Sequence, residues 1–368
     1  MRKKGKFLKK PLPVYASVML GISFVCLLVY VAARIFPSFA DALNGTVCHA
    51  LRRAFAFVTD AFPFSLAEVL ILASPAVVFL IIFRASRVKD GKGRIRFISG
   101  LLSVISLFFS LYWLMLGIGY HTVPISEKMG MDEAEVNKES LALAFSHLAA
   151  ECNSLAEELE LDESGASVMP ISFDEVCDHI LGGYRRLSED IPQIGVPIFD
   201  SRAKRVMLSK PMSALEITGV YTFFTGEANV NVYYPDYNLP FTAAHELAHQ
   251  RGIARENEAN FIAFLVCIAS DHPYVRYSGY MNMLEYVASA LKKTDPDEYR
   301  LLFSSLHPSV VSEMRSYSEF YNRNKKKFWS DLSDSANDNY LKAQGTEGIA
   351  SYGLVVRLCV SYYAAAEA

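Results

Sequence analysis

Three long apolar stretches in the first third of the chain constrain its fold more than any other feature. Val14 to Ala33 carry no charge for twenty residues, which is enough helix to span a bilayer. A cleaved signal peptide is the alternative, but this stretch is long for one and no clear small-x-small cleavage site follows it. We therefore predict three transmembrane helices, over about residues 14–35, 66–83 and 97–118.

The distribution of basic residues predicts how these helices are oriented. The first ten residues carry six positive charges, and residues 84–96 carry six more against the single acid Asp90. The connection between the first two spans has only Arg52 and Arg53. The positive-inside rule therefore places the N-terminus in the cytoplasm and everything after about His121 outside it. Residues 37–64 are amphipathic and predict one or two short helices at the membrane surface.

Composition agrees with a membrane anchor joined to a folded domain. The 368 residues are 52% hydrophobic with a mean hydropathy of +0.19, too apolar for an ordinary soluble enzyme. We divide the chain into an anchor over residues 1–124 and a domain over residues 125–368. A net charge of −3 does not suggest a nucleic-acid partner. The six cysteines form no CxxC pair, and we interpret them as small buried residues.

Hydrophobic periodicity predicts a mostly α-helical second domain with a small β element. The predicted helices cover residues 132–161, 173–191, 260–269, 280–291, 297–306 and 310–329, with a last helix or strand over 352–363. Asp174 is the expected cap of the second of these helices. The predicted strands cover residues 205–208, 219–224 and 228–233.

The stretch from Thr242 to Phe261 carries the chemistry. His245 and His249 are four residues apart and share one face of a helix, with Glu246 beside the first. This is the HExxH pattern of zinc peptidases, in which two imidazoles bind Zn²⁺ and the glutamate takes a proton from water. The surrounding residues are small or uncharged, except for Arg251, where such helices usually carry an apolar residue.

The third metal ligand is expected on a second helix, because Gly252 is a natural helix terminator. Glu256 and Glu258 both lie near the start of that helix. They are roughly 160° apart around it, so one helix cannot aim both at the same ion. The Glu-Ala-Asn segment resembles the third-ligand segment of several HExxH peptidases, which favours Glu258 and leaves Glu256 as the alternative.

The chain as a whole resembles a bacterial membrane-protein family known only as domain of unknown function 3810. The matching segments are residues 63–66, Gly219 with residues 225–231, residues 239–252 and 256–261, residues 277–280, and residues 351–353. The resemblance covers nearly the full length. It implies a three-span anchor and a zinc-peptidase-like domain, and it implies no substrate.

Three further polar residues are candidates for substrate contacts. Asn229 and Asn231 alternate on the strand before the HExxH helix, where they could hold a substrate backbone or satisfy turns. Tyr352 could stabilise an oxyanion, although packing is the commoner role of such an aromatic residue. His272 and His307 each precede a proline, and we interpret them as capping or surface groups without a functional role.

The sequence thus predicts a multi-pass protein of the bacterial plasma membrane with an extracytoplasmic, zincin-like metalloendopeptidase domain. The expected cofactor is Zn²⁺ on His245, His249 and Glu258, and Glu246 is the expected general base for a peptide or protein substrate. An intramembrane protease is an alternative, but charged residues at 251, 255, 256 and 258 make burial in lipid costly. A non-catalytic, metal-stabilised sensor or scaffold of the cell envelope is another alternative.

Overall fold

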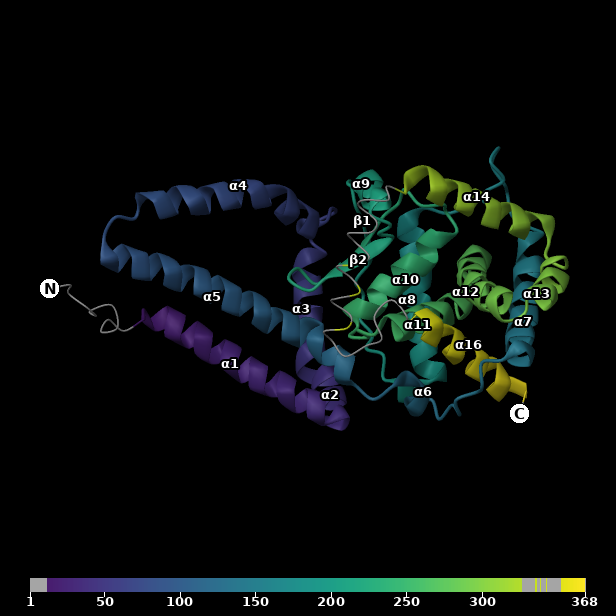
Figure 1. The fold of residues 1–368 in the computed structure, drawn as a ribbon, viewed down its shortest axis with the longest axis horizontal. Coiled ribbons are helices and arrows are strands. Elements are labelled where there is room, and N and C mark those ends of the chain that lie inside the picture. The colour runs from purple at the N-terminus through teal and green to yellow at the C-terminus, as the bar shows by residue number, and fades with distance from the viewer. Residues whose placement is uncertain (1–11, 326–334, 336–337, 339–341, 343–351, 368) are drawn as a thin grey trace.

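Three long helices project from one side of a helical domain in the computed structural model (Figure 1). The structure describes residues 12–325, the single residues 335, 338 and 342, and residues 352–367. The long helices are α1 (Val14–Ile35), α4 (Leu66–Arg87) and α5 (Gly91–Met115), and each is long and apolar enough to cross a membrane. The three predicted apolar helices are confirmed, with α4 ending later and α5 starting earlier than predicted.

The helices α1 and α5 pack against each other through small residues. The buried positions are Ala16, Cys26 and Ala33 on α1 and Ser99, Ser106 and Ser110 on α5, together with Met115. Small side chains allow helix backbones to approach closely, which is how helices associate in an apolar solvent. In contrast, α4 stands apart from this pair along most of its length (Figure 1).

The connection between α1 and α4 lies against the domain. It forms α2 (Pro37–Leu43), a π-helical turn η1 (Asn44–Cys48) and α3 (His49–Thr59). The Nζ atom of Lys204 donates to the carbonyl oxygen of Thr59 at 2.6 Å, and Ser201 Oγ donates to Asp60 Oδ1 at 3.1 Å. Arg52 is completely buried here. The residues predicted to lie at the membrane surface therefore also pack onto the domain.

The domain is mostly helical, as predicted. Its helices are α6 (Ile125–Lys128), α7 (Lys138–Ala156), α8 (Phe173–Asp190), α9 (Ser209–Ala214), α10 (Asn238–Gln250), α11 (Glu256–Ile268), α12 (Pro273–Thr294), α13 (Pro296–Phe303), α14 (Pro308–Asn324) and α16 (Tyr352–Glu367), with 3₁₀ turns η2 (Gly117–His121) and η3 (Pro192–Ile194). His272 and His307 cap α12 and α14, which confirms the predicted capping role. The cap of α8 is Ser172 in a capping box with Glu175, not Asp174.

The helix α11 forms the centre of the domain. Every residue from Glu258 to Cys267 is buried, and the helix packs against α8, α10, α12 and α16. A helix that is apolar on all sides is stable in water only when other elements surround it. The six cysteines are free and buried, in agreement with their interpretation as packing residues.

A small three-stranded sheet lies against α10. Its strands β1 (Lys204–Arg205), β2 (Gly219–Thr222) and β3 (Glu227–Val230) have the order β1-β3-β2. The strand β3 is central, parallel to β1 and antiparallel to β2. The chain after β1 enters α9, so the first strand is shorter than predicted. Among the strands that the structure describes, β2 pairs only with β3, which leaves its outer edge without a strand partner.

Candidate metal centre

The helix α10 brings the two histidines of the HExxH pattern together. All its residues except His245 are classed as buried, and His245 is only partly exposed. The Nε2 atoms of His245 and His249 lie 3.0 Å apart. The Nδ1 atom of His249 lies 2.7 Å from the carbonyl oxygen of Ile253, and this contact fixes the ring so that Nε2 faces His245. The i, i+4 spacing therefore produces the predicted pair of imidazoles.

A tight reversal after α10 positions the third group. Gly252 has φ of +95°, a conformation that glycine adopts without strain. The amide of Ile253 donates to Ala248 O at 3.0 Å and the amide of Gly252 donates to His249 O at 2.9 Å, which is a Schellman motif. Asn44 of η1 donates its Nδ2 proton to the Gly252 carbonyl at 3.1 Å. The turn at the end of α10 is thus held partly by the connection between α1 and α4.

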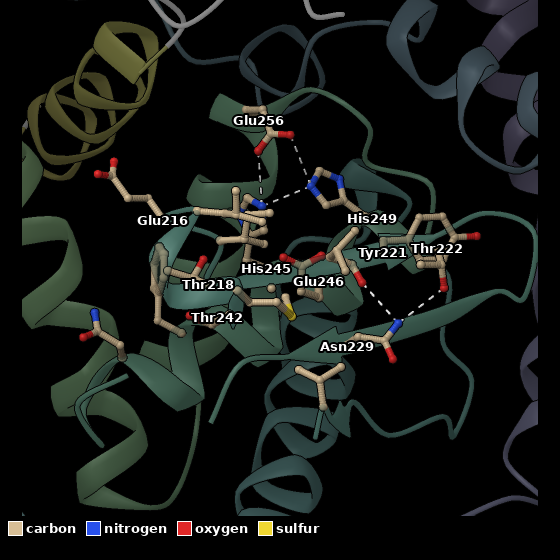
Figure 2. A pocket seen from close by; sticks show the side chains of 18 of the residues that line it. Glu216, Thr218, Tyr221, Thr222, Asn229, Thr242, His245, Glu246, His249 and Glu256 are labelled. Carbon is tan, nitrogen blue, oxygen red and sulfur yellow. Dashed lines mark hydrogen bonds and ion pairs between the residues drawn. The ribbon is translucent and has the colours of Figure 1, made fainter. Parts of the chain in front are cut away.

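Glu256, the first residue of α11, faces the two imidazoles (Figure 2). Its Oε2 atom lies 3.3 Å from His245 Nε2, and its Oε1 atom lies 3.6 Å from His249 Nε2. These three side chains are a group whose ligand atoms could hold one metal ion.

The structure does not bring Glu258 to the imidazoles, so the expected third ligand is corrected to Glu256. The Oε1 atom of Glu258 accepts a hydrogen bond from the amide of Ile125 at 3.1 Å and pairs with Arg255 Nη1 at 2.7 Å. Because the two glutamates are two positions apart on one helix, their carboxylates point in different directions. The rotation of α11 against α10 aims the first at the metal centre and the second at the segment that follows α5.

The geometry of the three ligands fits zinc. A tetrahedral zinc ion with bonds of about 2.0–2.2 Å places its ligand atoms about 3.3–3.5 Å apart. The two imidazole nitrogens lie 3.0 Å apart, and each lies 3.3 or 3.6 Å from one of the two carboxylate oxygens of Glu256, so all three separations are close to this value. Two imidazoles and one carboxylate also leave one of four positions free for water, as in catalytic zinc sites.

The carboxylates and the imidazoles of this site stabilise each other's charged forms. Burial disfavours a charged imidazole, but Glu256 and Glu246 together raise the pKa of His249 to about 9. Burial alone would raise the pKa of Glu256, but the neighbouring histidines hold it below its ordinary value. The centre therefore stabilises positive charge between these side chains, which is what a bound cation supplies.

Glu246 lies beside the metal centre with one oxygen available for chemistry. It is only 4% exposed, and its Oε2 atom is buried without a hydrogen-bond partner among the residues that the structure describes. Burial raises the pKa of this carboxyl group, while His245 and His249 act in the opposite direction. A buried polar atom without a partner is costly, and such atoms often mark a site for a water or a substrate.

Gly219 of β2 makes room for Glu246. A Cβ atom on this residue would lie 2.6 Å from Glu246 Oε1 and 2.9 Å from the carbonyl oxygen of Asn229, closer than real contacts allow. An isolated glycine within a predicted strand indicates a close approach of this kind. The sequence places Gly219 at the start of a predicted strand and within the family resemblance, and neither pattern predicts a role for it at the site.

Asn229 and Asn231 lie in the sheet rather than at a free strand edge. Asn229 Nδ2 donates to the Val220 carbonyl at 3.3 Å, and Asn231 Nδ2 donates to the Ile217 carbonyl at 2.9 Å. Both edges of β3 are paired, so this strand cannot bind a substrate backbone as predicted. The free edge belongs to β2. Tyr352 is the first residue of α16, and its side chain lies outside the described residues.

The metal centre opens into a cleft with a cavity volume of about 1110 Å³. His245, Glu246, His249 and Glu256 line one part of it, and β2 forms a neighbouring wall. The cleft also reaches the ends of two long helices through Ile71 of α4 and Tyr112 of α5. No local sequence pattern predicts that residues of these apolar helices line the site.

Comparison with protein families finds one match. The model of the family described as Protein of unknown function (DUF3810) covers residues 44–360 of this chain, so the chain belongs to that family. No curated protein and no solved structure matches it.

Proposed function

We propose that this DUF3810 chain is a membrane-anchored zinc peptidase that hydrolyses peptide bonds with Glu246 as general base. One observation carries the proposal: a zinc-sized triangle of His245, His249 and Glu256 lies beside a buried glutamate with a free oxygen, at the wall of a large cleft. A structural zinc site is normally closed by four protein ligands. This centre offers three, together with a carboxylate that is not one of them.

The residues of the chain would share the chemistry as follows. Zinc bound to the three ligands supplies a water of lowered pKa and polarises the scissile carbonyl group. Glu246 accepts the proton of the attacking water on its free oxygen and passes it to the nitrogen of the leaving amine. Gly219 lets β2 approach Glu246, so a substrate backbone on the free edge of β2 would pass close to this base.

The decisive test compares two variants of the full-length protein purified in detergent. Glu246→Gln should keep bound zinc and lose about 10²–10⁴-fold in peptide cleavage, because the amide keeps the shape but cannot accept the proton. His249→Ala should lose both zinc and cleavage. Metal content measured by plasma mass spectrometry, with cleavage of a mixed peptide library, gives both readouts. Equal cleavage by wild type and Glu246→Gln would overturn the mechanism, and zinc retention without any wild-type cleavage would favour the metal-stabilised sensor or scaffold.

A further inference from the structure

The cleft that holds the metal centre has a wall built from the helices that could cross a membrane. Ile71 lies in the second turn of α4, Tyr112 lies in the last turn of α5, and Leu116 follows directly after α5; all three line the cleft. The same cleft is lined by His245 and Glu246. The proposed catalytic groups and the domain-side ends of two apolar helices therefore share one continuous space.

The start of α4 is fixed to the domain rather than tethered loosely to it. Both carboxylate oxygens of Glu227 in β3 accept from the first backbone amides of α4, those of Leu66 and Ala67, at 3.0 and 2.8 Å. In turn, the carboxylate of Glu68 in α4 accepts hydrogen bonds from the backbone amides of Met207 and Leu208 in the domain, at 3.0 and 2.6 Å. These are charge-assisted contacts at buried carboxylates, which are strong. Four hydrogen bonds thus hold the start of α4, which forms part of the cleft wall, against the domain.

Beyond this anchored start, α4 is not covered by the rest of the described chain. From Val69 to Arg87 every residue of α4 is exposed, so no part of the chain that the structure describes buries this length of the helix. The helix α5 packs instead against α1. In Figure 1, α4 and α5 converge toward their connection far from the domain and are separated on the side that faces the domain. In a bilayer, this side would be open to lipid and to other membrane-embedded chains.

The strand β2 leads from the candidate metal centre toward the end of α5. It starts at Gly219 beside Glu246, and its far end continues into Phe223 and Phe224. The ring centroid of Phe223 lies 4.8 Å from that of Phe108 and 5.4 Å from that of Tyr112, and both of these residues are on α5. The stretch from Gly219 to Phe223 spans about 14 Å at the rise of a β-strand. An extended peptide on the free edge of β2 would therefore have one end at Glu246 and the other at the membrane helices.

We infer that the substrates of this site are membrane-anchored polypeptides, which enter between α4 and α5 and are cut in the segment next to their own transmembrane helix. This inference rests on the proposed peptidase function and names its substrate class. The stretch of about 14 Å sets the cut about four residues from the end of the substrate's transmembrane helix. Catalysis itself stays outside the lipid, because Glu256, Arg255 and Glu258 lie in the domain.

The test uses the full-length protein in vesicles of phosphatidylethanolamine and phosphatidylglycerol. Its substrates are two peptide libraries that each join a randomised segment to an apolar transmembrane helix. The randomised segment precedes the helix in one library and follows it in the other. A matched library lacks the helix. We expect cleavage of an anchored library at least about tenfold faster than that of the free library, with cut sites clustered near the helix. Equal rates, or cut sites unrelated to the helix, would overturn the inference but leave the peptidase function intact. Absence of any zinc-dependent cleavage would overturn both.

Two variants of α4 test the route of entry. Ile71→Trp narrows the cleft where α4 meets it and should lower the ratio of anchored to free cleavage at least about threefold, since a bulkier side chain obstructs the path. Ile82→Trp adds the same bulk to an exposed position of α4 that does not line the cleft, and it should leave the ratio unchanged. Zinc content of both variants confirms that they are folded. An unchanged ratio in Ile71→Trp would place the entry elsewhere and contradict the inference.

Discussion

At the scale of single residues, Glu256 and Glu258 divide two roles between them. Glu256 faces the imidazoles, and Glu258 pairs with Arg255 and accepts from the amide of Ile125. Glu256→Gln should weaken zinc binding by at least about 100-fold, because an amide oxygen is a far weaker zinc ligand than a carboxylate. Glu258→Gln should keep zinc but lower stability by about 1–3 kcal/mol, because it leaves Arg255 without its anion.

Competition with a zinc chelator measures the affinity of both variants, and thermal unfolding in detergent measures their stability. The two substitutions are chemically identical and lie two positions apart, so each controls for the other. Strong loss of zinc from Glu258→Gln with retention in Glu256→Gln would reverse the assignment of the third ligand.

Gly219 provides a second test at this scale. In Gly219→Ala, the new Cβ atom would lie 2.6 Å from Glu246 Oε1, so either Glu246 or β2 must move. We expect kcat for peptide cleavage to fall about 10–100-fold, because a misplaced general base loses most of its effect. Zinc content should stay near that of wild type, since no ligand is touched. Gly182→Ala is a suitable control, because a Cβ atom there meets nothing within 4 Å.

The residues of the metal centre could be predicted only as far as they depend on local spacing. The positions of His245, Glu246 and His249 follow from the helical repeat, and the turn follows from Gly252. The choice between Glu256 and Glu258 depends on how α11 is rotated against α10. That rotation is fixed by distant partners, including the Ile125 amide and the apolar residues around α11, which no local pattern contains.

At the scale of elements, buried carboxylates outside the site make stability depend on pH. Glu313 of α14 is fully buried, and both its oxygens accept from the Ser167 amide at 3.1 Å. Burial raises its pKa to about 7, while the bonds from Ser167 act in the opposite direction and Asp236 and Asp162 add to the rise. The folded state therefore keeps a proton that the unfolded state releases above its ordinary pKa of 4.5.

The sign of the effect follows from this difference. A raised pKa in the folded state gives stability that is fully present below pH 4.5 and is lost as the pH rises through about 7. We expect the contribution of Glu313 to the free energy of unfolding to fall by about 2–3 kcal/mol between pH 5 and pH 9. Glu313→Gln should remove most of that decrease. Thermal unfolding of both proteins across this range measures it, and parallel curves would contradict the prediction.

Elements were predictable where hydrophobic periodicity was long and regular. The three apolar helices and most helices of the domain appear near their predicted residues, whereas α9 and the precise ends of the short strands do not. Six residues such as those of α9 carry too little periodicity to distinguish helix from loop. The burial of Arg52 could not be predicted, because packing of the connection between α1 and α4 onto the domain depends on contacts that are distant in sequence.

At the scale of the whole molecule, the arrangement of the three long helices supports the proposed orientation in the membrane. The start of α1 and the connection between α4 and α5 lie at the same far end from the domain (Figure 1). Both regions are rich in basic residues, with twelve Lys and Arg in total against two in the connection between α1 and α4. Basic residues stay on the cytoplasmic side, so the domain should lie outside the cytoplasm.

Reporter fusions that are active in only one compartment test this orientation. A fusion at residue 10 and one at residue 90 should both report the cytoplasm, and a fusion after Ala368 should report the opposite side. Replacing the six basic residues from 84 to 96 with glutamine should lower the fraction of chains in this orientation, because it removes half of the basic residues that define it. A cytoplasmic signal from the C-terminal fusion would mean that one of the three apolar helices does not cross the bilayer. The metal centre would then face the cytoplasm, and its substrates would have to be cut on that side of the membrane.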